Sequence, residues 1–201
     1  MIEPSVSSFS ADPLTPESRL LLDAWHHWRG ARLLPNRSEV ELRDITRILP
    51  WVLILEFKSI DEAIFRLAGS QYREELGFEP TGLNYVALAK PADRRLRGAL
   101  LQAELAQPCG ATMIYRQEYA SGLTVPVEIL SLPLLRDDEK TPSQVIVVST
   151  KLASARGYDD ISGKNYLPAG EDLRFIDIGA GVPDKSAIIA QLAATGSSHA
   201  G

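Results

Sequence analysis

The chain has 201 residues, 45% of them hydrophobic, which fits one globular domain and excludes a disordered chain. Its formal net charge of −5 disfavours a general nucleic-acid binder, and its single cysteine, Cys109, excludes an intrachain disulfide. No apolar run approaches the roughly 18 residues of a membrane span, and the first ten residues lack the pattern of a secretory signal. We therefore expect a cytoplasmic protein.

The first expected element is an amphipathic helix that starts at Thr15 and ends at Gly30. A threonine caps helix starts and a glycine ends helices, and apolar side chains recur between them at helical spacing. The apolar stripe consists of Leu20, Leu21, Ala24, Trp25 and Trp28. Two tryptophans on one short helix need a cover, either the sheet or a second copy of the chain. We expect Leu21, Trp25 and Trp28 to form a dimer surface.

A second helix is predicted from Ser38 to Leu49. Ser38 and Glu41 have capping-box spacing, and Pro50 ends the element. The chain then turns directly into an extended segment, because a residue before proline favours extended geometry.

Five segments have the composition of strands. They are rich in β-branched and aromatic residues and cover 51–57, 63–68, 111–119, 125–135 and 144–152. Short links join the first two segments to each other and the last three segments in series. A short link cannot make the crossover that parallel strands need, so these neighbours must pair antiparallel. Helices predicted at 71–77 and 91–106 then lie on one face of that sheet. In the second of them, the expected apolar face is Ala92, Leu96, Ala99, Leu100 and Ala103, with Arg97 and Glu104 placed mostly elsewhere.

The remaining chain reads as an appendage. Residues 154–171 are polar, 173–178 predict a short strand, 185–194 a helix and 196–201 a disordered end. The predicted organisation is therefore a flexible start (1–14), a helical extension (15–50), a core (51–153) and this appendage (154–201).

Motifs for metal or nucleophilic chemistry are weak. His26 and His27 are adjacent and point to different sides of a helix, so no metal site is expected. The string from Phe175 to Gly181 resembles the glycine-rich loop of nucleotide-binding enzymes, but too little chain follows it to complete such a fold. Cys109 lies in a turn and is expected to be structural.

Five short strings occur in a definite order and spacing: Trp28-Arg29-Gly30, Leu34-Pro35-Asn36-Arg37, Ile48-Leu49-Pro50, Phe65-Arg66-Leu67-Ala68-Gly69-Ser70 and Thr81-Gly82. Together they resemble a known family, the compact bacterial PAS-like proteins. The resemblance covers about residues 16–152. It implies an α+β fold with a five-stranded antiparallel sheet, helices on one face, and a small pocket between them.

The resemblance also implies a sensory or regulatory role. It places Tyr72 and Tyr85 in the helical wall of the pocket and Arg66 at the end of the second strand. With Tyr115, these residues are our candidates to orient a small, mostly apolar ligand. Cys109 is not in a flavin-attaching motif and the central helices contain no histidine. We therefore expect neither covalent flavin nor haem, and predict no cofactor.

The combined hypothesis is a stand-alone signalling module that binds a small ligand, a partner protein or both, as a homodimer. Two alternatives stay open. One is a small isomerase or hydrolase, which requires a buried acid with a perturbed pKa facing a cleft, with Glu118 and Glu128 as candidates. The other is a docking module whose core is filled.

Overall fold

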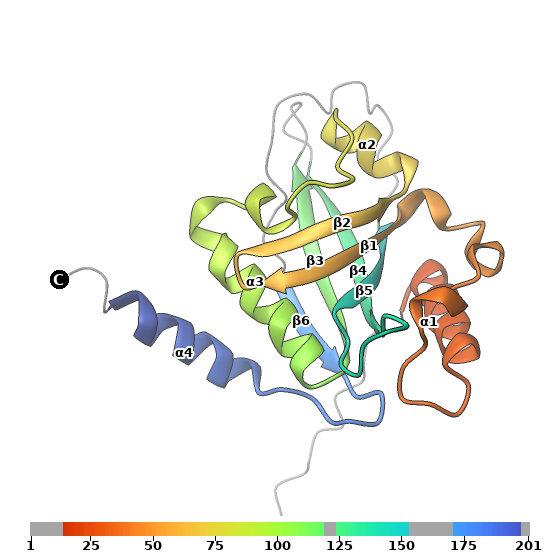
Figure 1. Ribbon diagram of the computed structural model, residues 1–201. Helices are drawn as coiled ribbons and strands as arrows, with labels where there is room; N and C mark the ends of the chain where they lie inside the picture. The colour runs from red at the N-terminus through yellow and green to blue at the C-terminus, as the bar shows by residue number, and fades with distance from the viewer. Residues whose placement is uncertain (1–13, 119–123, 153–170, 198–201) are drawn as a thin grey trace, which may run out of the picture.

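The computed structural model describes residues 14–118, 124–152 and 171–197. The expected flexible start and most of the expected irregular stretch and disordered end lie outside these ranges. The described elements form one antiparallel sheet with helices packed against it (Figure 1). This arrangement confirms the predicted α+β class.

The sheet has six strands in the order β2-β1-β5-β4-β3-β6, and every neighbouring pair is antiparallel. Their bounds are Val52–Ser59 (β1), Glu62–Ala68 (β2), Gly110–Glu118 (β3), Thr124–Leu134 (β4), Gln144–Lys151 (β5) and Glu171–Ile176 (β6). The predicted count of five was one short, because β6 pairs with β3. Without β6, β3 would be an edge strand with unpaired backbone groups.

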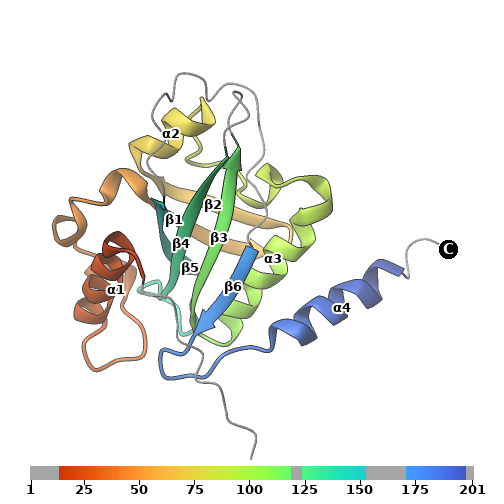
Figure 2. The ribbon, with the colours of Figure 1, turned by 180° about the vertical axis from the view of Figure 1, so that it is seen from behind.

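Four α-helices of the described residues accompany the sheet. They span Pro16–Arg29 (α1), Ser70–Leu76 (α2), Pro91–Ala106 (α3) and Lys185–Ser197 (α4). Helix α1 lies against β4 and β5, and α3 lies on the other side of the sheet. Helix α4 contacts α3 and then projects away from the sheet in both views (Figures 1 and 2).

The prediction of a helix from Ser38 to Leu49 is wrong. This region forms three short 3-10 turns, Arg37–Glu39, Leu42–Ile45 and Leu49–Trp51. Backbone pairing to the end of β4 holds the first turn: Arg37 N–H donates to Leu135 O at 2.7 Å, and Leu135 N–H donates to Pro35 O at 3.0 Å. This long-range pairing overrides the local helix signal.

Side chains alternate between the two faces of the sheet. Ile54 and Ile146 belong to the core under α1, whereas Leu53 and Val147, their neighbours in sequence, belong to the core under α3. This period of two is the pattern of strands that are buried on both sides. The sheet therefore separates two apolar cores.

Helix α1 is fixed to its face by polar contacts at its N-terminus and at Trp25. The Thr15 backbone N–H and hydroxyl both donate to Glu128, at 3.1 and 2.6 Å. The Trp25 indole donates to Pro133 O at 2.9 Å. Leu21 and Trp25 have no exposed surface and Trp28 is 6% exposed. The dimer surface predicted on these three residues is therefore corrected: α1 needs its apolar stripe to cover the chain's own sheet.

Candidate functional site

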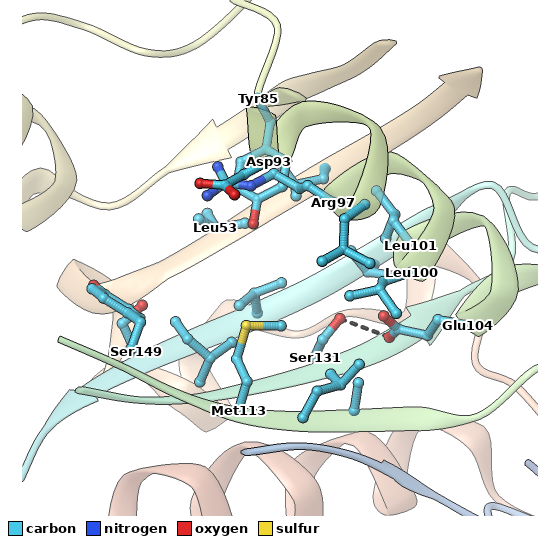
Figure 3. A pocket seen from close by; sticks show the side chains of 18 of the residues that line it. Leu53, Tyr85, Asp93, Arg97, Leu100, Leu101, Glu104, Met113, Ser131 and Ser149 are labelled. Carbon is cyan, nitrogen blue, oxygen red and sulfur yellow. Dashed lines mark hydrogen bonds between the residues drawn. The ribbon is translucent and has the colours of Figure 1, made fainter. Parts of the chain in front are cut away.

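A cavity of about 130 Å³ lies between α3 and the inner face of the sheet (Figure 3). Its walls combine strands that are distant in sequence, including β6. The apolar lining residues are Leu53, Leu55, Leu96, Leu100, Leu101, Ala111, Met113, Ile129, Val145, Val147, Leu173 and Phe175. The polar ones are Tyr72, Tyr85, Asp93, Arg97, Glu104, Tyr115, Ser131 and Ser149. A mainly apolar concavity with a few polar groups is typical of a small-molecule site.

Helix α3 forms one wall through residues spaced three or four positions apart. They are Asp93, Leu96, Arg97, Leu100, Leu101 and Glu104. This spacing places them on one helical face. The helix lies close to the β1–β2 hairpin at Gly98, where an added Cβ would come within 1.7 Å of Ile60 O. A glycine at this position lets α3 approach the sheet.

The most buried titratable group of the cavity is Glu104, which is 4% exposed. Its Oε1 accepts a hydrogen bond of 2.7 Å from the Ser131 hydroxyl (Figure 3). Burial raises the pKa of Glu104 to about 8, and the Ser131 hydrogen bond opposes this rise only in part. The carboxyl is therefore mostly protonated at pH 7 and can act as a hydrogen-bond donor.

A second polar group lies where β5 meets α2. The hydroxyls of Tyr72 and Ser149 share a hydrogen bond, and both residues are buried. Burial raises the pKa of Tyr72 above its ordinary value, so its phenol stays neutral. Both residues line the cavity.

The third polar group gathers Tyr85, Asp93 and Arg97 at one end of the cavity (Figure 3). The Arg97 guanidinium lies 4.6 Å from the centre of the Tyr85 ring, a cation–π geometry. The Tyr85 ring also packs edge-on against Phe65 at 5.6 Å. These contacts fix the orientation of the ring at this end.

Of the residues proposed from sequence to orient a ligand, Tyr72, Tyr85 and Tyr115 line the cavity. Arg66 does not. Its side chain is 46% exposed and forms an ion pair with Glu56, which Lys58 and Arg136 also approach. Burial of Glu56 opposes its ionisation, but hydrogen bonds from Lys58 and Arg66 lower the net pKa. Arg66 therefore stabilises the charge of the buried Glu56 carboxylate.

Sequence reasoning missed Arg97, Glu104 and Ser131. Arg97 and Glu104 were expected mostly outside the apolar face of α3, whereas both line the cavity. The sequence feature that could have placed them there is their spacing: each lies three residues from one of Leu100 and Leu101 and four from the other. Because α3 has small residues on several sides, its composition alone did not show which face meets the sheet.

Of the two acids proposed for an enzyme, Glu128 does not line the cavity. Glu128 lies on the α1 side of the sheet, where it accepts both hydrogen bonds from Thr15. The side chain of Glu118 lies outside the described part of the structure. Glu104 does have the predicted signature of a buried acid facing a cavity. Among the described residues, the hydrogen-bond partner of its carboxyl is the Ser131 hydroxyl. A carboxyl and a neutral hydroxyl do not form the pair of acid and base that proton transfer to a substrate needs.

The remaining motifs also have structural explanations. The Asp177 carboxylate accepts hydrogen bonds from the N–H groups of Gly179 and Gly181, at 2.7 and 2.9 Å. These are the backbone donors that a bound phosphate would need. Cys109 is fully buried, and burial raises the pKa of its thiol to about 12. A thiol of this kind is inert.

Within residues 14–118, 124–152 and 171–197, no three His, Cys, Asp or Glu side chains gather closely enough to hold a metal ion. None of the described helices is long and apolar enough to cross a membrane.

A family model described as a PAS domain matches residues 14–148. No protein with curated annotation matches the chain in sequence. Similar solved structures include a Rhodobacter sphaeroides LOV protein (15% identity, TM-score 0.36), of which 59% is covered against 51% of this chain. The LOV domain of the Erythrobacter litoralis EL346 blue-light-activated histidine kinase has 18% identity and a TM-score of 0.35, with 51% of this chain and 95% of that one covered.

A third structure, the PAS-B domain of Drosophila melanogaster Cycle with bound glycerol, has 13% identity and a TM-score of 0.34, with 50% of this chain and 99% of that one covered. The chain spans less than two thirds of the length of the R. sphaeroides protein. At these scores the structural similarities add no argument about function. The family match covers most of the chain and does not depend on them.

Proposed function

We propose that this chain, which belongs to the PAS domain family, binds a small, mainly apolar molecule in the α3 cavity and transmits a signal of that binding to a partner protein. PAS domains are sensory and regulatory modules rather than catalytic ones, so membership supports a signalling role.

The observation that carries the proposal is the cavity itself. A packed core of this size would contain few voids larger than a water molecule. Here a volume of about 130 Å³ borders Leu101, Met113 and Val147, with polar groups at separate points of its wall. This combination favours ligand binding over the alternative of a docking module with a filled core.

The size of the cavity restricts the ligand. Pockets for drug-sized molecules measure roughly 300–1,000 Å³, whereas a cavity of about 150 Å³ holds a molecule the size of benzene. At about 130 Å³ the cavity fits a single ring or a short branched chain. Flavin and haem are larger than such molecules, so the proposed ligand is neither of them.

The C-terminal segment is the proposed route of the signal. Leu173 and Phe175 of β6 line the cavity, and the Lys185 ammonium at the start of α4 donates to Leu173 O at 3.2 Å. A ligand that favours one packing of β6 would therefore also favour one arrangement of α4. A homodimer and a cytoplasmic location stay predictions, and the dimer surface is not the apolar stripe of α1.

A screen of the full 201-residue chain with single-ring compounds tests the ligand proposal. Native mass spectrometry of the freshly purified protein, followed by thermal unfolding with each compound, should detect a bound molecule or a raised Tm. As a control, Ala111→Ile fills part of the cavity wall and should abolish the effect. Failure of every compound to raise the Tm, with no molecule retained, would contradict ligand binding.

A further inference from the structure

The Glu104 carboxyl is the deepest polar group of the cavity that carries an ionisable proton. Its residue is 4% exposed, and its hydrogen-bond partner among the described residues is the Ser131 hydroxyl, 2.7 Å from Oε1. Among those residues, no basic group forms an ion pair with it; the cationic Arg97 of the same helix lies against the Tyr85 ring. A buried acid without a cation is stable only in its neutral form.

The neutral acid has a definite hydrogen-bonding capacity. Oε1 accepts from Ser131, so the proton on the second oxygen is available to donate. Burial raises the pKa of the group to about 8, which keeps the carboxyl mostly protonated at pH 7. An apolar ligand would leave this donor without an acceptor, which costs free energy in a dry cavity.

We propose that Glu104 determines ligand specificity, and that it selects neutral, single-ring-sized molecules with one hydrogen-bond acceptor, such as a ketone oxygen. This inference rests on the proposed function of the cavity. The surrounding apolar residues contact the body of the molecule, and the Glu104 proton fixes its orientation. A cationic ligand is disfavoured because its charge would enter a mainly apolar space facing a neutral group.

Three probes with one carbon skeleton separate these possibilities. Ethylbenzene has no acceptor, acetophenone has a ketone oxygen, and 1-phenylethylamine is a cation at neutral pH. The Kd of each is measured at pH 7 by NMR titration of the full chain. Acetophenone should bind about two- to tenfold more tightly than ethylbenzene, the range expected for one net hydrogen bond, and the amine should bind most weakly.

Variants assign the preference to Glu104. Glu104→Gln keeps an N–H donor and should retain the preference for acetophenone. Glu104→Leu should abolish it while ethylbenzene still binds. Met113→Leu alters the apolar lining on β3; it is expected to change both affinities together, so the ratio of the two Kd values should stay at the wild-type value.

The outcomes separate this inference from the proposed function. Equal binding of ethylbenzene and acetophenone to the wild type, tightest binding of the amine, or a preference retained by Glu104→Leu would overturn the role of Glu104 and leave the pocket intact. Failure of all three probes to bind the wild type would overturn the role of Glu104, and together with a negative screen and no retained molecule it would overturn the proposed function as well.

Discussion

The two faces of the sheet bury similar side chains with different results. Under α1, Leu21 and Trp25 pack against β4 and β5 with no exposed surface. Under α3, Leu101 and Val147 border a cavity of about 130 Å³. The α1 face is closely packed, whereas the α3 face encloses the space that the proposed function assigns to a ligand. We therefore expect stability and binding to depend on opposite faces, so that substitutions can separate them.

The largest contrast should come from one substitution made on each face. Leu21→Ala removes fully enclosed contacts and should lower the free energy of unfolding by about 3–5 kcal/mol. Leu101→Ala, in the other helix, should cost about 2 kcal/mol, because a side chain beside a void has fewer contacts to lose. Urea unfolding followed by circular dichroism measures both. Equal costs would mean that the two faces are equally well packed.

The second effect is a pH dependence confined to the α3 face. The folded-state pKa of Glu104 is about 8, above the ordinary value of 4.5. Between these values the folded chain holds a proton that the unfolded chain has released, so stability is present below pH 4.5 and falls as pH rises toward 8. Glu104→Gln removes the ionisable group and with it this loss of stability. The free energy of unfolding of the variant minus that of the wild type should therefore be about 2–4 kcal/mol larger at pH 8 than at pH 5.

Other ionisable groups that line the cavity or touch Glu104 must be separated from this effect. They are Tyr72, Tyr85, Asp93, Arg97, Cys109 and Tyr115. Burial raises the pKa values of Tyr72 and Cys109 well above pH 8, so neither ionises in this window. Glu128→Gln on the α1 face is a matched control and should not reproduce the change in slope. The same slope in wild type and Glu104→Gln would show that Glu104 does not hold the proton.

A smaller effect is expected where α3 meets the hairpin. Gly98→Ala places a methyl group against Ile60 O and should push the helix outward, at a cost of about 1–3 kcal/mol. Gln102→Ala, on the exposed part of the same helix, should change stability by less than about 0.5 kcal/mol. A neutral Gly98→Ala variant would show that α3 has room to shift, contrary to a fixed cavity wall.

The smallest stability effect should follow enlargement of a small side chain that faces the cavity. Ala111→Ile fills empty space and should change the free energy of unfolding by less than about 1 kcal/mol, while acetophenone affinity falls at least tenfold. Ala24→Ile in α1 enters a filled core and should cost about 1–3 kcal/mol with affinity unchanged. Similar stability losses in both variants would remove the distinction between the faces.

Local sequence signals predicted the strands well and the cavity only in part. The runs around Ile54 and Val147 were recognisable because β-branched residues cluster between turns. The 3-10 region was mispredicted because backbone pairing with Leu135, far along the chain, decides its geometry. Pairing of β6 with β3 is equally long-range. Local composition does not identify the distant partner of a segment, so neither the pairing with Leu135 nor the pairing of β6 with β3 could be predicted from it.

The polar residues of the cavity show the same limit. The resemblance to PAS proteins placed Tyr72 and Tyr85 in the helical wall, and both line the cavity. It also suggested Arg66, which instead pairs with Glu56 on the exposed side of β2. Glu104 escaped notice because a glutamate on a helix ordinarily faces water. Only the packing of α3 shows that this one is enclosed.

The central claim is that the α3 face, and not the α1 face, takes up a small molecule. Its most direct test is a methyl NMR titration of the full chain, labelled at Ile, Leu, Val and Met, with acetophenone. Saturable shift changes should appear at Leu53, Leu101, Met113 and Val147 and stay small at Ile54, Leu132 and Ile146. Shift changes spread equally over both faces, or none that saturate, would contradict the account.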